Sequence, residues 1–210
     1  MNLQETSTIP QRLLNEVLVY WPYAKQERVM FQFLMVTGCR ITELDAMKPE
    51  NLVKNAKGQD IIYWVTGKTG GYRFAEIPAV LMSEYIEYRQ TNRTFPDKLF
   101  GMKSESFGRK FNGIRKYLSI EWNEYKMTMK EGILVPEYKY QLKMVRKNFN
   151  TLTFNRLLIE TGNASLALEL TKKLLNHQSV HMNILHYYDP TNKDSRLPKE
   201  QLLKEVQCRL

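Results

Sequence analysis

Two short runs of β-branched and aromatic residues interrupt an otherwise helical hydrophobic pattern, and they constrain the fold more than any other feature. The runs are Asp60–Thr66 and Tyr72–Ile77, and Gly67-Lys68-Thr69-Gly70-Gly71 joins them. Such residues favour strands, and a glycine-rich segment supplies the backbone freedom of a turn. The sequence therefore predicts an antiparallel hairpin with Lys68 at its tip or flank. A third strand is expected at Leu52–Lys54.

Helical periodicity lies on both sides of this hairpin. From Ser119 to Tyr140 the pattern is irregular and contains Gly132 and Pro136, so we expect a loop or an insertion there. The predicted fold class is α+β, mainly α, with one small three-stranded antiparallel sheet. Helices are expected from Pro10, at about Lys25–Thr37, from Arg40 to before Pro49, at Pro78–Arg89 and at Ser104–Leu118. A further helix passes through Leu157 and Leu158 and stops at Gly162, another starts at Asn163, and the last is Pro198–Leu210.

Composition narrows the choice of partner. The 210 residues carry a formal net charge of +9, which attracts polyanions, and nucleic acid is the first candidate. The two cysteines, Cys39 and Cys208, form neither a disulfide framework nor a metal-binding cluster. The apolar run Val29–Val36 is too short to span a bilayer, and the N-terminus lacks the plan of a signal peptide. We expect an intracellular protein, cytoplasmic or nucleoid-associated, without a metal.

A lone arginine follows a helix-breaking glycine in Thr37-Gly38-Cys39-Arg40-Ile41-Thr42-Glu43-Leu44. A guanidinium at a helix junction needs an anion, because an unpaired charge that leaves water costs several kcal/mol. Glu43, three residues further on, can supply that anion on the helix surface. A bound ligand is the alternative.

Four segments in this order resemble the catalytic domain of the tyrosine recombinases, the phage integrase family. The resemblance covers roughly Pro10 to Asp189 and ends in the pair Tyr187-Tyr188. The first segment matches the family's Thr-Gly-x-Arg-x-x-Glu-Leu box, and Gly67-Lys68-Thr69-Gly70 matches its catalytic hairpin. Its second arginine box and its Leu-Gly-His-x-Ser segment are matched by Arg146-Lys147-Asn148-Phe149-Asn150-Thr151 and Leu175-Asn176-His177-Gln178-Ser179.

The resemblance implies a reaction and gives each residue a role. Arg40 and Arg146 would grip the non-bridging oxygens of a DNA phosphodiester, and Lys68 would protonate the leaving 5′ oxygen. His177 would hydrogen-bond the phosphate or the nucleophile. The product is a 3′-phosphotyrosine, formed without a metal or a nucleotide cofactor.

Two positions depart from the family pattern. Lys143 stands three residues before Arg146, where the family usually has histidine. Lysine keeps the positive charge but is a poor proton shuttle near neutrality. The nucleophile commonly lies nine or ten residues after the histidine, which favours Tyr187 over Tyr188; adjacent helical residues point about 100° apart, so only one of them can reach the phosphate.

Basic residues with apolar partners suggest a surface for DNA. In Ser104–Leu118 the apolar side of the predicted helix turns its basic residues outward, as a phosphate-tracking helix requires. A merely solvated face is the alternative. The predicted DNA-binding residues are Arg109, Lys110, Arg115, Lys116, Lys139 and Lys147.

These expectations define a domain plan and its alternatives. Residues 1–188 would form the catalytic domain, and 189–210 a linker and helix that dock on a neighbouring protomer or on their own domain. Because only about ten residues precede the first helix, we expect either a catalytic fragment or a minimal single-domain recombinase. The partners would be double-stranded DNA and further copies of the chain, as a tetrameric synapse. A non-catalytic DNA-binding protein and a relaxing topoisomerase are the alternative functions.

Overall fold

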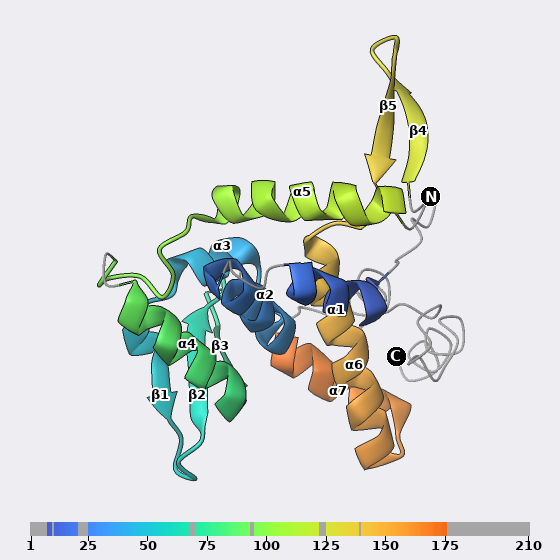
Figure 1. Ribbon diagram of the computed structural model, residues 1–210. Helices are drawn as coiled ribbons and strands as arrows, with labels where there is room; N and C mark the ends of the chain where they lie inside the picture. The colour runs from blue at the N-terminus through green and yellow to red at the C-terminus, as the bar shows by residue number, and fades with distance from the viewer. Residues whose placement is uncertain are drawn as a thin grey trace.

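The computed structural model describes residues 8–9, 11–20, 25–67, 70–92, 95–121, 125–138 and 140–175 (Figure 1). None of the helices in these ranges is long and apolar enough to cross a membrane. The elements are α1 (Gln11–Tyr20), α2 (Lys25–Thr37), α3 (Ile41–Ala46), η1 (Pro49–Asn51), β1 (Leu52–Lys54), β2 (Asp60–Val65), β3 (Tyr72–Glu76), α4 (Ala79–Thr91), α5 (Ser104–Glu121), β4 (Tyr125–Lys130), β5 (Ile133–Tyr138), α6 (Lys143–Thr161) and α7 (Ala164–Leu175).

Helix α2 lies at the centre of the core. Its side chains Val29, Met30, Phe31 and Phe33 are completely buried. The ring of Phe33 meets that of Phe100 edge-on at 5.3 Å between centroids, a favourable geometry for aromatic pairs. Because α2 packs against α4, α6 and β3, its C-terminal end is held on several sides.

The predicted hairpin and third strand are confirmed. Strands β1, β2 and β3 form an antiparallel sheet in that order. Ile62 and Trp64 of β2 point inward and are buried, as the period of two in a half-buried strand requires. Trp64 is opposite Arg73 in the register of β2 and β3.

We expected a loop or an insertion between Ser119 and Tyr140, and the loop is wrong, because the segment contains a second hairpin. Strands β4 and β5 pair antiparallel and project beyond the end of α5, away from the other elements (Figure 1). Gly132 forms the turn with φ +80° instead of breaking the structure, and Glu131 before it has φ +50°. Pro136 lies within β5, a position compatible with an isolated two-stranded ribbon.

The end of α6 and the start of α7 agree with the sequence analysis. Gly162 ends α6 in the left-handed conformation, with φ +62°. The side chain of Asn163 caps α7 by accepting a hydrogen bond from the backbone N–H of Leu166 at 3.1 Å. The junction between α6 and α7 is therefore fixed by two ordinary capping devices.

Candidate active site

The turn between α2 and α3 places the first arginine. Gly38 leaves α2 with φ +58°, a conformation that side chains rarely adopt. A Cβ atom at this position would lie less than 3.0 Å from two ring atoms of Phe149 on α6. Glycine is thus required twice, by the backbone angle and by the close approach of α6. The turn delivers Arg40 to the N-cap position of α3.

Glu43 is the anion that Arg40 meets in this structure. The carboxylate accepts a hydrogen bond from the backbone N–H of Arg40 at 2.8 Å and one from its Nη1 at 2.6 Å. The pair therefore caps α3 and orients the guanidinium at the same time. Because 35% of the Arg40 side chain is still exposed, the guanidinium can also reach a ligand from solvent.

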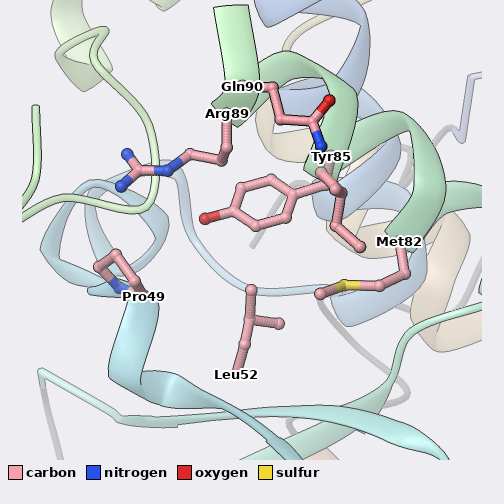
Figure 2. Close-up of a pocket in the computed structure, with 7 residues that line it drawn as sticks. Pro49, Leu52, Met82, Tyr85, Arg89 and Gln90 are labelled. Atoms are coloured by element: carbon pink, nitrogen blue, oxygen red, sulfur yellow. The ribbon is translucent and has the colours of Figure 1, made fainter. Parts of the chain in front are cut away.

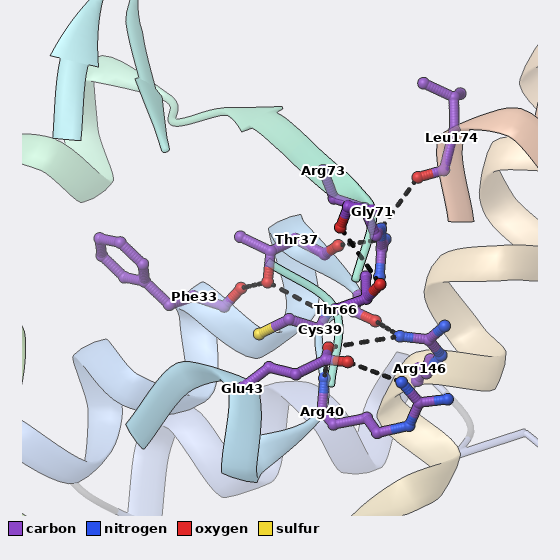
Figure 3. A network of polar contacts seen from close by, with 11 residues as sticks. Phe33, Thr37, Cys39, Arg40, Glu43, Thr66, Gly71, Arg73, Arg146 and Leu174 are labelled. Atoms are coloured by element: carbon purple, nitrogen blue, oxygen red, sulfur yellow. Dashed lines mark hydrogen bonds and ion pairs between the residues drawn. The ribbon is translucent and has the colours of Figure 1, made fainter. Parts of the chain in front are cut away.

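Arg146 reaches the same carboxylate from α6. Its Nη1 donates to the carbonyl of Gly38 at 2.9 Å, across 108 residues of sequence, and lies 3.8 Å from Glu43 Oε2. Unlike Arg40, its side chain is buried. The structure thus brings together, at the carboxylate of Glu43, the two arginines that the sequence analysis selected (Figure 3).

Sequence analysis missed a third arginine at this cluster, Arg73 on β3. The residue is only 3% exposed, whereas its neighbours Tyr72 and Phe74 are 76% and 64% exposed. Its Nε donates to the carbonyl of Leu174 at 3.0 Å, and its Nη2 to that of Thr37 at 3.2 Å. Its guanidinium carbon lies 4.8 Å from the centre of a Trp64 ring. An arginine between two aromatic residues in a strand was the available signal.

The electrostatics of the cluster favour an added anion. Within the described part of the chain, Arg40, Arg73 and Arg146 lie near the single carboxylate of Glu43, so positive charge is in excess among these four largely buried side chains. Burial, together with the charge of Arg146, lowers the pKa of Arg73 to about 10. A negatively charged group would relieve this repulsion, and a phosphate has the oxygen geometry that guanidinium groups bind best.

Cys39 lies at the cluster but cannot act as a nucleophile there. Burial raises the pKa of its thiol from 9.0 to about 11, although a hydrogen bond to Thr37 opposes this shift. The thiolate is the reactive form of cysteine. The residue is therefore a buried protonated thiol that packs the turn between Gly38 and Arg40.

The remaining predicted catalytic residues fall into two groups. Lys143 is the first residue of α6 and is exposed, one helical turn before Arg146. The others, Lys68, His177, Tyr187 and Tyr188, lie outside the described residues. The described chain around them stops at Gly67, resumes at Gly70, and ends at Leu175. Among the described residues, no group of three or more His, Cys, Asp or Glu side chains is arranged to hold a metal ion.

The predicted DNA-binding residues of α5 are not equivalent. Arg109 and Lys116 are exposed. Lys110 is also exposed, but its ammonium pairs with the buried carboxylate of Glu27. Arg115 donates a hydrogen bond to the carbonyl of Tyr140 at 2.9 Å, so its guanidinium already has a partner within the protein. Of the other two, Lys147 is half-buried on α6, and Lys139 lies outside the described residues.

A separate hollow lies on the sheet side of α4 (Figure 2). Burial raises the pKa of Tyr85, one of its lining residues, to about 12, so the phenol stays neutral. No residue of the arginine cluster takes part in it. The lining residues are Pro49, Leu52, Met82, Tyr85, Ile86, Arg89 and Gln90.

Comparison with known structures defines the class of fold: the chain has the fold of the tyrosine recombinase catalytic domain. XerH recombinase bound to its difH substrate in a pre-cleavage complex is 17% identical, with a TM-score of 0.59 over 100% of this chain and 56% of that one. XerA recombinase is 16% identical, with a TM-score of 0.62 over 97% of this chain and 64% of that one. The catalytic domain of bacteriophage HP1 integrase is 15% identical, with a TM-score of 0.51 over 88% of this chain and 90% of that one.

The chain thus spans a little over half of XerH and less than two thirds of XerA, but most of the HP1 domain. No protein-family model matches the sequence. No curated protein sequence matches it either. The similarity is therefore one of fold.

Proposed function

We propose that this chain is the catalytic unit of a site-specific DNA recombinase, which cuts and rejoins DNA through a 3′-phosphotyrosine intermediate. The observation that carries the proposal is the meeting of Arg40 and Arg146 on Glu43 within this fold. Two arginines held in this way suit the binding of a phosphodiester in fork geometry. The structures of XerH bound to difH support DNA as the partner.

The arginines do the electrostatic part of the proposed reaction. Attack on phosphorus concentrates negative charge on the non-bridging oxygens, and preorganised donors stabilise that charge. Removing one such donor typically costs about 3–4 kcal/mol in the transition state. Glu43 keeps both guanidinium groups in place before DNA arrives, so little reorganisation is needed when DNA binds.

The bond changes require a nucleophile and an acid. Tyr187, or alternatively Tyr188, would form a bond from its phenol oxygen to phosphorus, while the bond from phosphorus to the 5′ oxygen breaks. A free phenol is only roughly one part in a thousand ionised at neutral pH, so nearby cations must favour its ionised form. Lys68 would give a proton to the leaving 5′ oxygen, and His177 would hydrogen-bond the phosphate or the phenol oxygen. Rejoining reverses these transfers.

Covalent trapping tests the proposal. The probe is a pool of DNA duplexes with a randomised core, in which sulfur replaces the bridging 5′ oxygen at one linkage. Because the released thiolate is a poor nucleophile toward phosphorus, the covalent adduct accumulates and survives denaturation. We expect an adduct with the unchanged protein, and mass spectrometry of its phosphotyrosyl peptide distinguishes Tyr187 from Tyr188. The matching Tyr→Phe variant should form none.

The same probe tests the role of Lys68. A thiolate leaves without a proton, so Lys68→Ala should cut the sulfur-containing duplex at nearly the normal rate but lose activity on ordinary DNA. Arg146→Gln should lose activity on both, because the phosphate oxygens are the same in each.

A second function has one observation in its favour. Lys143 is exposed and replaces the usual histidine, which fits a protein that kept the fold and lost the chemistry. Such a non-catalytic DNA-binding protein would still bind DNA but would form no covalent adduct with any duplex of the pool. Relaxation of plasmids that lack a specific site would instead indicate a topoisomerase.

A further inference from the structure

Arg73 occupies a position that normally belongs to an apolar residue. It points inward from β3, is almost fully buried, and lies against Trp64 from β2. Burying a charge is costly unless hydrogen bonds and favourable charges compensate for it. The two other arginines nearby add repulsion. The structure must therefore use the guanidinium for something that an apolar side chain cannot do.

The guanidinium makes two hydrogen bonds that an apolar side chain cannot make, and they cap the C-terminal ends of two helices at once. Thr37 is the last residue of α2, and Leu174 is the last but one of α7. Carbonyls in the final turn of a helix have no partner within the helix, and a cation there is favoured by the helix dipole. Arg73 donates to both carbonyls from one planar group, joining segments 36 and 101 residues away from it in sequence.

Both helix ends lead directly into proposed catalytic segments. The carbonyl of Thr37 is followed by Gly38 and then, after one residue, by Arg40; the carbonyl of Gly38 accepts from Arg146. The two buried arginines thus hold successive carbonyls of one turn. At the other end, Leu174 precedes His177 by three residues. Arg73 itself stands on the strand that follows Lys68.

We infer that Arg73 is a positioning residue for DNA cleavage, fixing the end of α7 against the turn that carries Arg40. This inference rests on the proposed function. Arg73 is too buried to touch DNA, so it acts through the two backbone carbonyls. Its removal should slow cleavage without weakening DNA binding, because displacement of reacting groups by about 1 Å can cost about 100-fold in rate.

The test compares three variants on the sulfur-containing duplex pool and on one trapped sequence recovered from it. Arg73→Met removes both hydrogen bonds, and Arg73→Lys keeps the charge but cannot donate to both carbonyls in the same geometry. The matched control is Arg89→Met, which also removes an arginine that donates to two backbone carbonyls, those of Phe95 and Lys98, away from the cluster. Single-turnover cleavage, the Kd for uncut duplex and hydrogen exchange in α7 are measured for each.

We expect Arg73→Met to cleave about 100-fold more slowly, with unchanged Kd and faster exchange at the end of α7. Arg73→Lys should recover part of the rate, and Arg89→Met should cleave normally. If Arg73→Met does not fold, the same three measurements on Arg73→Lys test the inference.

Cleavage by the Arg73 variants at the unchanged protein's rate would overturn the inference and leave the proposed function standing. So would a fall in rate matched by an equal loss of DNA binding, which indicates a structural role alone. No adduct from the unchanged protein would count against the proposed function itself. In that case faster exchange at α7 in Arg73→Met would still support the link between the two helix ends.

Discussion

Glu43 is the residue on which the cluster depends, because it is buried and faces two guanidinium groups. Glu43→Gln keeps the shape but removes the negative charge. We expect a loss of about 3–5 kcal/mol in the free energy of unfolding, since the buried cation Arg146 loses a neighbouring anion. Urea denaturation measures the loss.

The matched control for Glu43 is Glu160→Gln. Glu160 pairs with Arg156 on the same helix as Arg146, but both side chains are more than half exposed. Removing this surface pair should cost less than about 0.5 kcal/mol. Equal losses in the two variants would contradict the central role of Glu43.

Cys39 gives a pH-dependent contribution to stability. Its pKa is raised from 9.0 to about 11 by burial, so between these values the unfolded chain releases the thiol proton and the folded chain keeps it. The neutral thiol therefore makes its full contribution to the free energy of unfolding below about pH 9, and this contribution is lost as the pH rises through about 11. Two pH units correspond to about 2–3 kcal/mol.

The measurement for Cys39 is urea denaturation across that pH range in a Cys208→Ser background. The unchanged Cys39 protein should lose stability more steeply with pH than Cys39→Ala, because alanine has no proton to release. Parallel pH profiles for the two proteins would show that the thiol is not held in its neutral form.

At the residue scale, the sequence singled out Arg40 and Arg146, each from a local pattern, and the structure places both at Glu43. Arg73 could not be found in this way. Its role depends on Thr37 and Leu174, and the distance in sequence to Leu174 is 101 residues. A single strand residue carries no local sign of such distant partners. The nearest hint is its place between Tyr72 and Phe74.

At the element scale, the turn between α2 and α3 sets how closely α6 can approach. Gly38→Ala should destabilise the fold for two reasons, the positive φ and the clash with Phe149. We expect about 1 kcal/mol from the backbone and a further 1–3 kcal/mol, roughly, from the clash. Thermal or urea unfolding measures the sum.

Gly70 offers the control for this turn. It has φ +64°, close to that of Gly38, but a Cβ atom there would meet nothing within 4 Å. Gly70→Ala should therefore show only the backbone part of the loss. Adding Phe149→Leu to Gly38→Ala should recover part of the difference, whereas equal losses at the two glycines would rule out the steric explanation.

The two hairpins show why one could be predicted and the other not. In β2 the buried residues alternate with outward ones against a core, and this leaves a clear pattern of Ile and Trp. In the part of the chain that the structure describes, no core lies beneath strands β4 and β5, and Met129, Ile133 and Leu134 stay more than half exposed. Without burial on one face, selection for alternation is weak. The sequence there therefore looks irregular although the backbone is paired.

At the scale of the whole molecule, the site is assembled by packing and not by any one element. The turn after α2, strand β3, the first turns of α6 and the end of α7 all meet at the arginine cluster (Figure 3). Stability and proposed activity should therefore be coupled at Glu43 and Gly38. At exposed basic residues, by contrast, the effects should appear in DNA binding alone.

DNA binding by a chain of net charge +9 should weaken as salt rises, because each phosphate contact releases counterions. Helix α5 allows this to be tested with matched residues. Arg109→Gln or Lys116→Gln should lower the slope of log Kd against log salt by about one unit, the value for one lost phosphate contact. Lys110→Gln should change it less, because that ammonium is already paired with Glu27. Fluorescence anisotropy with a fixed duplex gives the slopes, and an equal or larger change for Lys110→Gln would place the DNA on a different face of α5.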